Sequence, residues 1–216
     1  MHNENEQSIE NRIPEPALRR LPWYLTYAKL SQANGEQFIS STQIAKDIGV
    51  DASQVAKDLS YVSVSGRTRV GYEVKLLVDV LEDFLGFTKI HKAFIFGVGS
   101  LGGALLQDNG LSQFGLKVLA GFDVKYELAG TRINHIPIHH LDHFFELQKQ
   151  TKTKIGILTV PANRAQAASE LMIEGGIKAI WNFTPFRIKV PDEIIVQNTS
   201  IYAHLAVMFN RLQTSE

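Results

Sequence analysis

Three glycines with the spacing G-x-G-x-x-G stand between a short apolar run, residues 92–96, and a helix-forming stretch, residues 101–107. The motif consists of Gly97, Val98, Gly99, Ser100, Leu101 and Gly102. After a buried strand, the first glycine permits a tight turn, the second lets the backbone approach a pyrophosphate, and the third lets the helix pack on the strand. The pattern predicts a dinucleotide phosphate site at a helix N-terminus.

A carboxylate follows at the distance that such a site requires. The next apolar run, residues 116–122, ends at Asp123, which is 21 residues beyond Gly102. A carboxylate there would accept from the ribose 2′-hydroxyl of NAD and repel the 2′-phosphate of NADP. Lys125 weakens this preference, because a lysine would meet a 2′-phosphate. The alternative is a structural glycine turn with a capping aspartate, but strand, glycines, helix, strand and acid in this order favour NAD.

The polar residues predict no catalytic centre. Hydride-transfer enzymes need a proton donor near the nicotinamide, and we find no recognisable catalytic motif and no room for a substrate domain. An NAD(P)-dependent oxidoreductase nevertheless stays open as an alternative. Four histidines lie close together, at 135, 139, 140 and 143, with only Asp142 and Glu146 as nearby carboxylates. Because their spacing crosses a predicted strand–helix junction, we expect a polar surface turn and no metal.

The chain contains no cysteine, which excludes disulfides, thiolate metal sites, iron–sulfur clusters and thiol redox switches. Any response to redox state would therefore need a bound ligand. No apolar run among the 216 residues approaches the roughly 18 residues of a membrane span, and the polar, acidic start has no signal-peptide core. We expect a cytoplasmic protein with no membrane contact.

Strand and helix patterns alternate after residue 87. Further strands are expected at 133–138, 154–160, 179–183 and 194–196, and helices at 141–150, from Asn163 (capped with Gln166) to 175, and at 200–212. This order predicts an α/β fold class, with a doubly wound parallel sheet of the Rossmann type. The helix at 200–212 carries Ile201, Leu205, Met208, Phe209 and Leu212 on one face, which suggests a dimerisation helix.

The segment 39–62 has the pattern of two helices around a tight turn. Ser40 with Gln43 is a capping signal, and Gly49 stands where the chain must leave the first helix. Asp51 with Gln54 is a second capping signal, and Ala45 would let the helices cross closely. The pattern predicts a helix-turn-helix with a recognition helix at 52–61. A helical hairpin with a solvated polar face is the alternative.

A basic segment follows the recognition helix. Residues 62–72 alternate at period two around Ser65-Gly66, which predicts a hairpin with Arg67 and Arg69 on one side of its second strand. Such a hairpin would be the wing of a winged-helix domain, its arginines contacting phosphates or a minor groove. On the recognition helix, Ser53, Gln54, Ala56 and Lys57 face outward, where they would meet base edges or phosphates.

Charge and pattern together predict four segments. Residues 18–72 contain seven basic and four acidic side chains, so this segment is weakly basic. The flanking segments 1–17 and 73–86 each contain one basic and four acidic side chains, so both are acidic. We expect an acidic, loosely docked tail at 1–17, a winged-helix domain with its connector helix at 18–86, a Rossmann NAD(H)-binding domain at 87–199 and a dimerisation helix at 200–216. The boundary between the two domains is expected near Phe87.

These residues resemble the Rex family of redox-sensing transcriptional repressors, over nearly the whole chain. The resemblance rests on RLPWY (20–24), ISSTQIAKDIGV (39–50), QVAKDLSY (54–61), VGY (70–72), GVGSLG (97–102), FD (122–123), VPANRAQ (160–166) and GIKAIWNFTP (176–185). It implies a homodimer that holds operator DNA when NAD⁺-bound or ligand-free, and that NADH releases. It also implies that Ser41 contacts DNA and that Val160, Pro161, Asn182 and Phe183 contact the cofactor.

The chain departs from the family pattern at several positions. Ala56 replaces a recognition-helix arginine, Thr26 replaces an arginine of the first helix, and Lys125 replaces a second acid. Asp108 stands for a tyrosine, and Ser200 with His204 stand for two acids that open the last helix. These changes bear on operator sequence and on the strength of the switch, and a redox-linked scaffold that has lost DNA binding is a further alternative. They leave the glycine motif intact.

Overall fold

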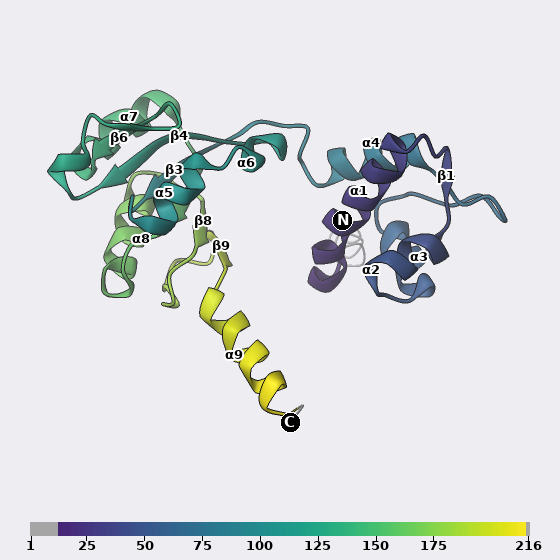
Figure 1. The fold of residues 1–216 in the computed structure, drawn as a ribbon. Helices are drawn as coiled ribbons and strands as arrows, with labels where there is room; N and C mark the ends of the chain where they lie inside the picture. Colours follow the sequence, from purple (N-terminus) through teal and green to yellow (C-terminus); the bar gives the residue numbers. More distant parts are fainter. Residues whose placement is uncertain (1–12, 215–216) are drawn as a thin grey trace, which may run out of the picture. The chain divides into compact units, whose positions relative to one another are not determined.

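The computed structural model describes residues 13–214, which form two compact units that divide between Lys89 and Ile90 (Figure 1). The first unit combines helices with a two-stranded antiparallel sheet, and the second surrounds a larger sheet with helices. The division lies close to the boundary expected near Phe87. Within the described residues, no helix is long and apolar enough to cross a membrane.

The first unit contains helices α1 (Glu15–Ala33), α2 (Ser41–Ile48), α3 (Ala52–Ser60) and α4 (Val74–Phe84). Strands β1 (Phe38–Ile39) and β2 (Tyr72–Glu73) pair antiparallel, a sheet that the sequence patterns did not predict. Because α1 begins at Glu15 and buries Ala17, the predicted tail at 1–17 is wrong for its last residues. Residues 1–12 of that tail lie outside the described residues.

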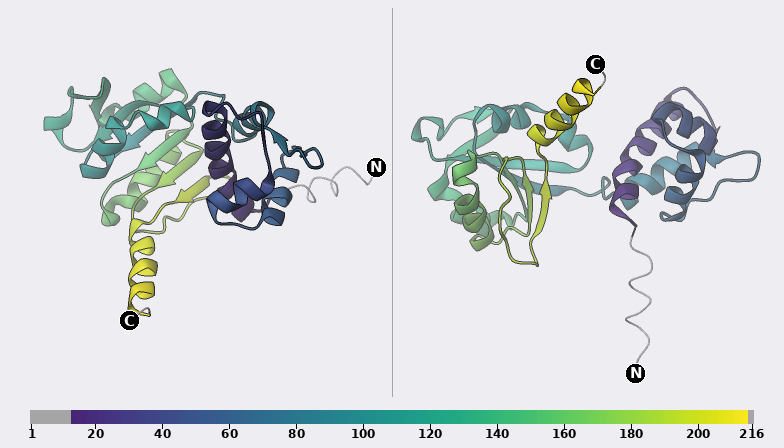
Figure 2. Two further views of the ribbon diagram at one scale, coloured as in Figure 1. Left: turned by 45° about the vertical axis from the view of Figure 1, so that its right-hand side comes forward. Right: turned by 90° about the horizontal axis from the view of Figure 1, so that it is seen from below.

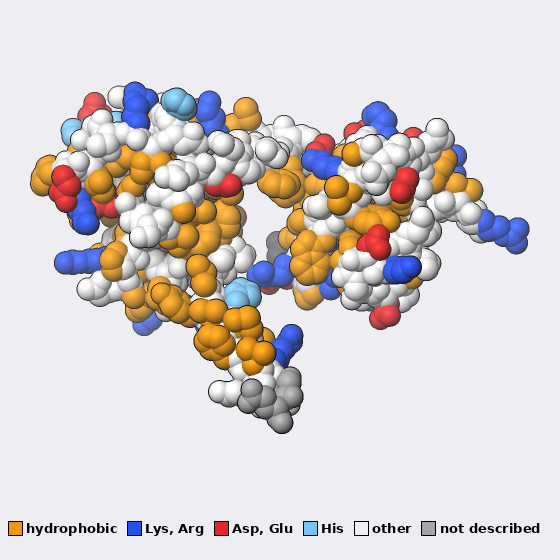
Figure 3. Space-filling model, in the orientation of Figure 1, with side chains coloured by type: hydrophobic (Ala, Val, Ile, Leu, Met, Phe, Trp, Pro, Cys, Tyr) orange, Lys and Arg blue, Asp and Glu red, His pale blue; other side chains and the backbone are white. Residues whose placement is uncertain are grey.

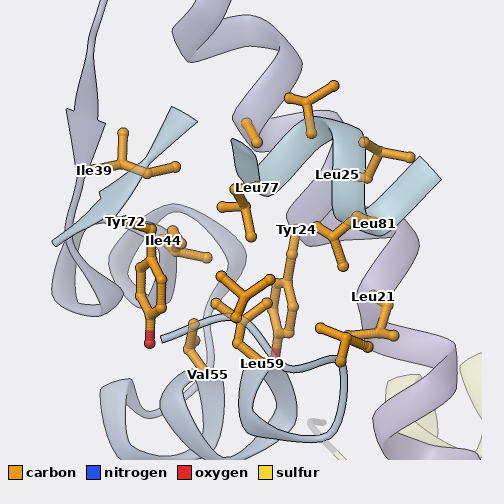
Figure 4. Packing of buried hydrophobic residues seen from close by; sticks show 14 of the residues in the cluster. Leu21, Tyr24, Leu25, Ile39, Ile44, Val55, Leu59, Tyr72, Leu77 and Leu81 are labelled. Atoms are coloured by element: carbon orange, nitrogen blue, oxygen red, sulfur yellow. The ribbon is translucent and has the colours of Figure 1, made fainter. Parts of the chain in front are cut away.

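The predicted start and end of α2 are both confirmed. Ser40 and Gln43 form a reciprocal capping box, and Gly49 has φ 75°, the left-handed conformation that favours glycine. Val55 and Leu59 of α3 are fully buried in the shared core (Figure 4). The second predicted cap is wrong: Asp51 makes no side-chain cap hydrogen bond, and the Gln54 side chain donates to Asp58 instead of bonding back to the start of the helix.

The hairpin predicted around Ser65-Gly66 is wrong in position and extent: the chain folds back between Arg67 and Gly71 instead. The only bridge in this segment joins Arg67 to Gly71, and Arg69 lies in the turn between them with φ 66°. Gly71 sets this geometry, since its φ is 100° and a Cβ there would overlap the carbonyl oxygen of Ile39. The two arginines therefore occupy the base and the turn of a short loop rather than one side of a strand.

The second unit has a sheet in the order β5-β6-β4-β3-β7-β8-β9. The strands are β3 (His91–Phe96), β4 (Leu116–Asp123), β5 (Arg132–Ile133), β6 (Ile136–His140), β7 (Ile155–Leu158), β8 (Ala179–Asn182) and β9 (Ile195–Asn198). All pairs are parallel except β5 with β6. Taken in chain order, the parallel strands have the 3-2-1-4-5-6 arrangement of the Rossmann fold.

Helices cover both faces of this sheet: α5 (Ser100–Gln107) lies on one face, and α7 (Phe144–Thr151) and α8 (Ala165–Glu174) lie on the other. The unit also contains α6 (Gly110–Gln113), α9 (Ile201–Gln213) and the short 3₁₀ turns η1 (Tyr126–Leu128), η2 (Leu141–His143) and η3 (Ala162–Arg164). Alternate residues of β3 point to opposite faces. Phe94 and Phe96 pack with Phe144 of α7 and Met172 of α8, whereas Ile95 packs with Leu106 of α5.

Two local predictions in this unit need correction. The strand expected at 133–138 is only partly right: Asn134 and His135 both have positive φ and form the turn between β5 and β6, and the strand itself is Ile136–His140. The cap expected from Asn163 and Gln166 is absent, since η3 precedes α8 and the Gln166 side chain bonds the backbone of Lys189. Asn134 and His135 are thus used in a turn, and Gln166 is used in a contact with a residue distant in the sequence.

Helix α9 is the least covered element of the second unit. Figure 2 shows it running away from the sheet, and Figure 3 shows orange hydrophobic side chains gathered along it. None of its residues is buried, and Tyr202, Phe209 and Leu212 are each more than half exposed. The Ser200 hydroxyl accepts from the Ala203 N–H at 3.2 Å and begins the helix.

Candidate functional site

A cleft of about 1290 Å³ opens at the carboxyl ends of the central strands. The loop after β3 and the loop after β7 form its floor, at the point where the strand order reverses direction. Ligands of open α/β sheets bind at such a switch point. Of the residues predicted to bind a cofactor, the lining contains Gly97, Val98, Gly99, Leu101, Asp123, Val160, Pro161 and Phe183.

The three glycines of the loop have three different environments. Gly97 has φ 95°, and its Cα faces the backbone of Thr159. A Cβ on Gly102 would overlap the carbonyl oxygen of Gly97, so this glycine lets α5 approach β3. Gly99 has nothing within 4 Å of where a Cβ would stand. The loop therefore leaves open space at the one glycine where a phosphate would approach the backbone.

Asp123 is bonded to the glycine loop itself. Its Oδ2 accepts from the Val98 N–H at 2.7 Å, and its Oδ1 accepts from the Lys125 N–H at 3.0 Å. The carboxylate ends β4 beside the loop that ends β3. It therefore lies beside the glycine loop, as the spacing predicted, with lone pairs left for further donors.

Three predicted residues do not line the cleft. Ser100 begins α5 and Gly102 packs beneath the loop. Asn182 is buried with its amide committed: Nδ2 donates to the Phe186 carbonyl and to Asn198 Oδ1, and Oδ1 accepts from the N–H and hydroxyl of Thr184. Asn182 thus shapes the loop that carries Phe183 rather than facing a ligand.

The cleft also contains residues that the spacing argument missed. The Thr159 hydroxyl donates to the Gly97 carbonyl at 2.7 Å and holds the glycine loop against β7. Arg164 and Lys125 bring positive charge to the lining, and Tyr202 of α9 reaches it. Arg164 lies inside the VPANRAQ segment, where a signal was available; Thr159 and Tyr202 become neighbours of the site only through the fold.

The histidines predicted as a surface turn divide into different roles. The His140 ring is mostly buried and stacks on Tyr126, with ring centroids 3.8 Å apart. Its Nε2 lies 3.1 Å from the Val124 carbonyl, so it supports the loop after Asp123. Burial lowers the pKa of His139, and the neighbouring His143 and Arg132 lower it further. In residues 13–214, no group of histidine and acidic side chains could hold a metal ion.

The first unit presents the residues predicted to contact DNA on α2, α3 and the loop after it. Ser53, Lys57 and Arg69 are exposed, and Ser41 and Gln54 are partly covered. Arg67 is exposed but lies 3.9 Å from Glu73 and above the Phe38 ring. Lys57 and Arg69 have no carboxylate within 4.0 Å among the described residues, which leaves their charges available to an anionic partner.

Beneath α3, a buried carboxylate joins the recognition helix to α1. Asp58 accepts from both Nε and Nη2 of Arg20, at 2.6 and 2.9 Å, and from the Tyr24 hydroxyl at 2.7 Å. Burial, the largest single influence, would raise the pKa of Asp58, but the hydrogen bonds from Arg20, Tyr24 and Gln54 together lower it. Burial and the bond to Asp58 raise the pKa of Tyr24 to about 12.

Comparisons with known proteins agree with this two-unit architecture. Residues 88–186 match a family model described as "CoA binding domain", and residues 12–60 match one described as "Putative DNA-binding protein N-terminus". The redox-sensing transcriptional repressor Rex of Bacteroides thetaiotaomicron is 63% identical over 99% of this chain and 98% of its own. The Rex protein of Treponema denticola is 42% identical over 93% and 98%.

Two solved structures resemble the whole chain. The crystal structure of RSP in complex with beta-NAD⁺ and operator DNA has a TM-score of 0.90 at 31% identity, covering 95% of each chain. The complex of RSP with beta-NADH has a TM-score of 0.84 at 32% identity, covering 94% and 95%.

Fold and cleft define a regulator class in which a helix-turn-helix unit is joined to a Rossmann domain. The high identity over nearly full length then makes the assignment specific: the chain belongs to the Rex family of redox-sensing transcriptional repressors.

Proposed function

We propose that this chain is a redox-sensing repressor that holds operator DNA through its first unit and is released from it when NADH binds the cleft of its second unit. The observation that carries the proposal is the switch-point cleft, where open space over Gly99 adjoins the Asp123 carboxylate. Relatives of the same architecture are described in complex with NAD⁺ and operator DNA, and with NADH. A DNA partner would place the protein in the bacterial cytoplasm.

In this proposal the cofactor is NAD(H), and each part of it meets a particular group. The backbone of Gly97, Val98 and Gly99, at the N-terminus of α5, would hold the pyrophosphate. Asp123 would accept from the adenosine ribose, and the loops carrying Pro161 and Phe183 would supply further contacts from the lining of the cleft. The dinucleotide supplies the redox dependence when it is bound.

Helix α9 supplies the proposed dimer contact. A helix that exposes Tyr202, Phe209 and Leu212 would leave a contiguous apolar surface in water, which soluble proteins rarely do. A second copy of the chain would cover this face. Because Tyr202 also lines the cleft, the same helix would connect the dinucleotide to the dimer.

The oxidoreductase alternative is less well supported. The described cleft is lined mainly by apolar side chains and backbone, with Asp123, Lys125 and Arg164 as its only charged groups in residues 13–214. Asp123 is held by two backbone amides, and the side chains of Lys125 and Arg164 are exposed, so none of the three forms a pair suited to proton transfer. We therefore propose a binding protein without catalytic residues.

One titration tests the whole proposal. The protein is bound to a labelled duplex carrying the promoter region of its own gene neighbourhood, and NADH or NAD⁺ is added at fixed salt. NADH should dissociate the complex at concentrations that leave it intact with NAD⁺. A complex that neither nucleotide affects would overturn the sensing role, and failure to bind DNA would favour the scaffold alternative.

A further inference from the structure

The recognition helix carries one carboxylate that no solvent reaches. Asp58 lies in the last part of α3 and is completely buried, on the side that faces α1. Nothing in the DNA-binding role requires a charge there, and an unpaired buried carboxylate would be strongly destabilising. A carboxylate at this position therefore needs hydrogen-bond donors and an opposite charge around it.

The hydrogen bonds to Asp58 divide evenly between its two oxygens. Oδ2 accepts from Nε of Arg20 and from the hydroxyl of Tyr24, whereas Oδ1 accepts from Nη2 of Arg20 and from Nε2 of Gln54. An ionised carboxylate offers about four lone-pair sites, so the group is saturated. Arg20 and Tyr24, both from α1, fix its orientation, and Gln54 is the one partner from α3 itself.

This arrangement also fixes the Gln54 side chain. A carboxylate oxygen only accepts, so the amide must turn its nitrogen toward Asp58, at 2.7 Å. The second N–H of that nitrogen and the Oε1 atom make no other hydrogen bond to the described part of the chain. Gln54 is the third residue of α3, and N-terminal residues of a recognition helix are those that meet base edges.

An amide with one N–H and one oxygen available matches a single base edge in the major groove. Adenine presents N7 as acceptor beside the N6 amino group as donor, and glutamine pairs with both at once. Guanine presents two acceptors there, which the oxygen of an amide would repel. The orientation of the amide therefore carries the base preference.

We propose that Asp58 is a positioning residue for operator recognition, which holds the Gln54 amide so that it pairs with an adenine. Arg20 and Tyr24 orient Asp58 in turn, so that residues of α1 determine the orientation of the Gln54 side chain on α3. The assignment rests on the proposed DNA-binding function and extends it to a specific base.

The test begins with the wild-type chain and a pool of randomised duplexes. Selected sequences from wild type and from Gln54→Ala identify the base pair whose preference depends on Gln54. Affinities are then measured for adenine and for guanine at that position. Wild type should prefer adenine by about tenfold or more, and Gln54→Ala should show less than a twofold preference.

Variants around the carboxylate distinguish positioning from folding. Asp58→Asn should lose the adenine preference as Gln54→Ala does, and the double variant should lose no more. Ser60→Ala, which removes an exposed hydroxyl of the same helix that donates to the Lys57 carbonyl and does not touch Asp58 or Gln54, is the matched control and should keep the preference. Circular dichroism checks that each variant folds, and Asp58→Glu, which keeps a negative charge opposite Arg20, replaces Asp58→Asn if that variant is unfolded.

The outcomes separate the two proposals. If the folded Asp58 variant binds all duplexes more weakly but keeps the wild-type preference for adenine, Asp58 only supports the fold and the assignment is overturned alone. If wild type selects no sequence from the pool, the proposed operator binding fails as well. A preference that depends on Gln54 but points to another base would overturn the adenine assignment.

Discussion

The backbone N–H of Val98 donates a hydrogen bond of 2.7 Å to Oδ2 of Asp123. The acid at the end of β4 is thereby tied to the glycine loop at the end of β3. Because the same carboxylate also accepts from the Lys125 N–H, it ties together the loops that follow β3 and β4 at the cleft. Asp123 therefore shapes the site in addition to its proposed bond with the ribose.

Replacement of Asp123 should weaken NADH binding and reduce the preference of the protein for NADH over NADPH. Asp123→Ala removes a charged acceptor and two hydrogen bonds to the loops, and hydrogen bonds to charged groups contribute about 1.5–3 kcal/mol. We expect NADH affinity to fall by about tenfold or more, measured by calorimetry. Lys125→Ala is the companion variant. It should increase the preference for NADH over NADPH, because it removes a cation that favours a 2′-phosphate. Equal affinity of the unmodified protein for NADH and NADPH would contradict the role of Asp123.

Gly99→Val should abolish dinucleotide binding and leave the protein folded. The added side chain meets no protein atom where its Cβ stands, so the loss of binding would come from the space it takes from the phosphates. Gly102→Val is the contrasting variant, because its Cβ overlaps the Gly97 carbonyl and should lower the unfolding temperature. Fluorescence titration with NADH and thermal unfolding measure the two effects. Undiminished NADH affinity in Gly99→Val would mean that the glycine loop is only a structural turn.

The order of elements in the second unit could be predicted because each element carries its own pattern. The apolar run before Gly97 and the acid after β4 are local features, and the strand order follows from the rules of parallel α/β folds. Thr159 could not be found in this way, because its bond to the Gly97 carbonyl joins residues 62 positions apart in the chain. Asn182 was misplaced for a similar reason, since its amide is used by a loop that folds back on it.

In the first unit, the capping contact could be predicted from the sequence, but the course of the loop after α3 could not. Ser40 and Gln43 form a contact three residues apart, which the sequence alone predicts. The course of the loop at 67–71 depends on how Gly71 passes the β1 backbone, and no period-two pattern contains that information. Gln54 was expected as a helix cap, but a buried carboxylate one turn later competes for its amide. Long-range or buried partners explain these differences.

Removal of exposed cations in the first unit should reduce the salt dependence of DNA binding. If Lys57 or Arg69 binds a phosphate, its replacement with alanine should lower the slope of log K against log salt by about 0.9 for each phosphate that is no longer neutralised. Arg67 should contribute less, because Glu73 lies near its guanidinium. Lys189→Ala, an exposed cation of the second unit, is the control. An unchanged slope and affinity would remove the residue concerned from the interface.

The Arg20–Asp58 pair should make stability depend on acid pH. The folded-state pKa of Asp58 is lowered from its ordinary value of 3.8, so its stabilisation is present above pH 3.8 and is lost as the pH falls below it. Asp58→Ala leaves the buried Tyr24 hydroxyl without its acceptor and the partly exposed Arg20 without its partner, and should cost about 1–3 kcal/mol at pH 7. Urea unfolding at pH 7 and at about pH 3 should show this difference shrinking in acid. A difference that stays constant over that range would mean that Asp58 is not ionised in the folded protein.

Truncation after Thr199 should yield a protein that dimerises poorly and no longer leaves DNA when NADH is added. Deletion of α9 removes its exposed apolar face, but it also removes Ile201 and Tyr202 from the cleft. A second variant, Phe209→Asp with Leu212→Asp, spares those two residues and should break the dimer while NADH still binds. Sedimentation measures the assembly, and NADH titration of the DNA complex measures the switch. The NADH response should be weaker than in typical members, or differently wired, because Asp108 and Ser200 stand where the family pattern has a tyrosine and an aspartate. A truncated chain that remains dimeric and still responds fully to NADH would show that the signal between ligand and DNA does not pass through α9.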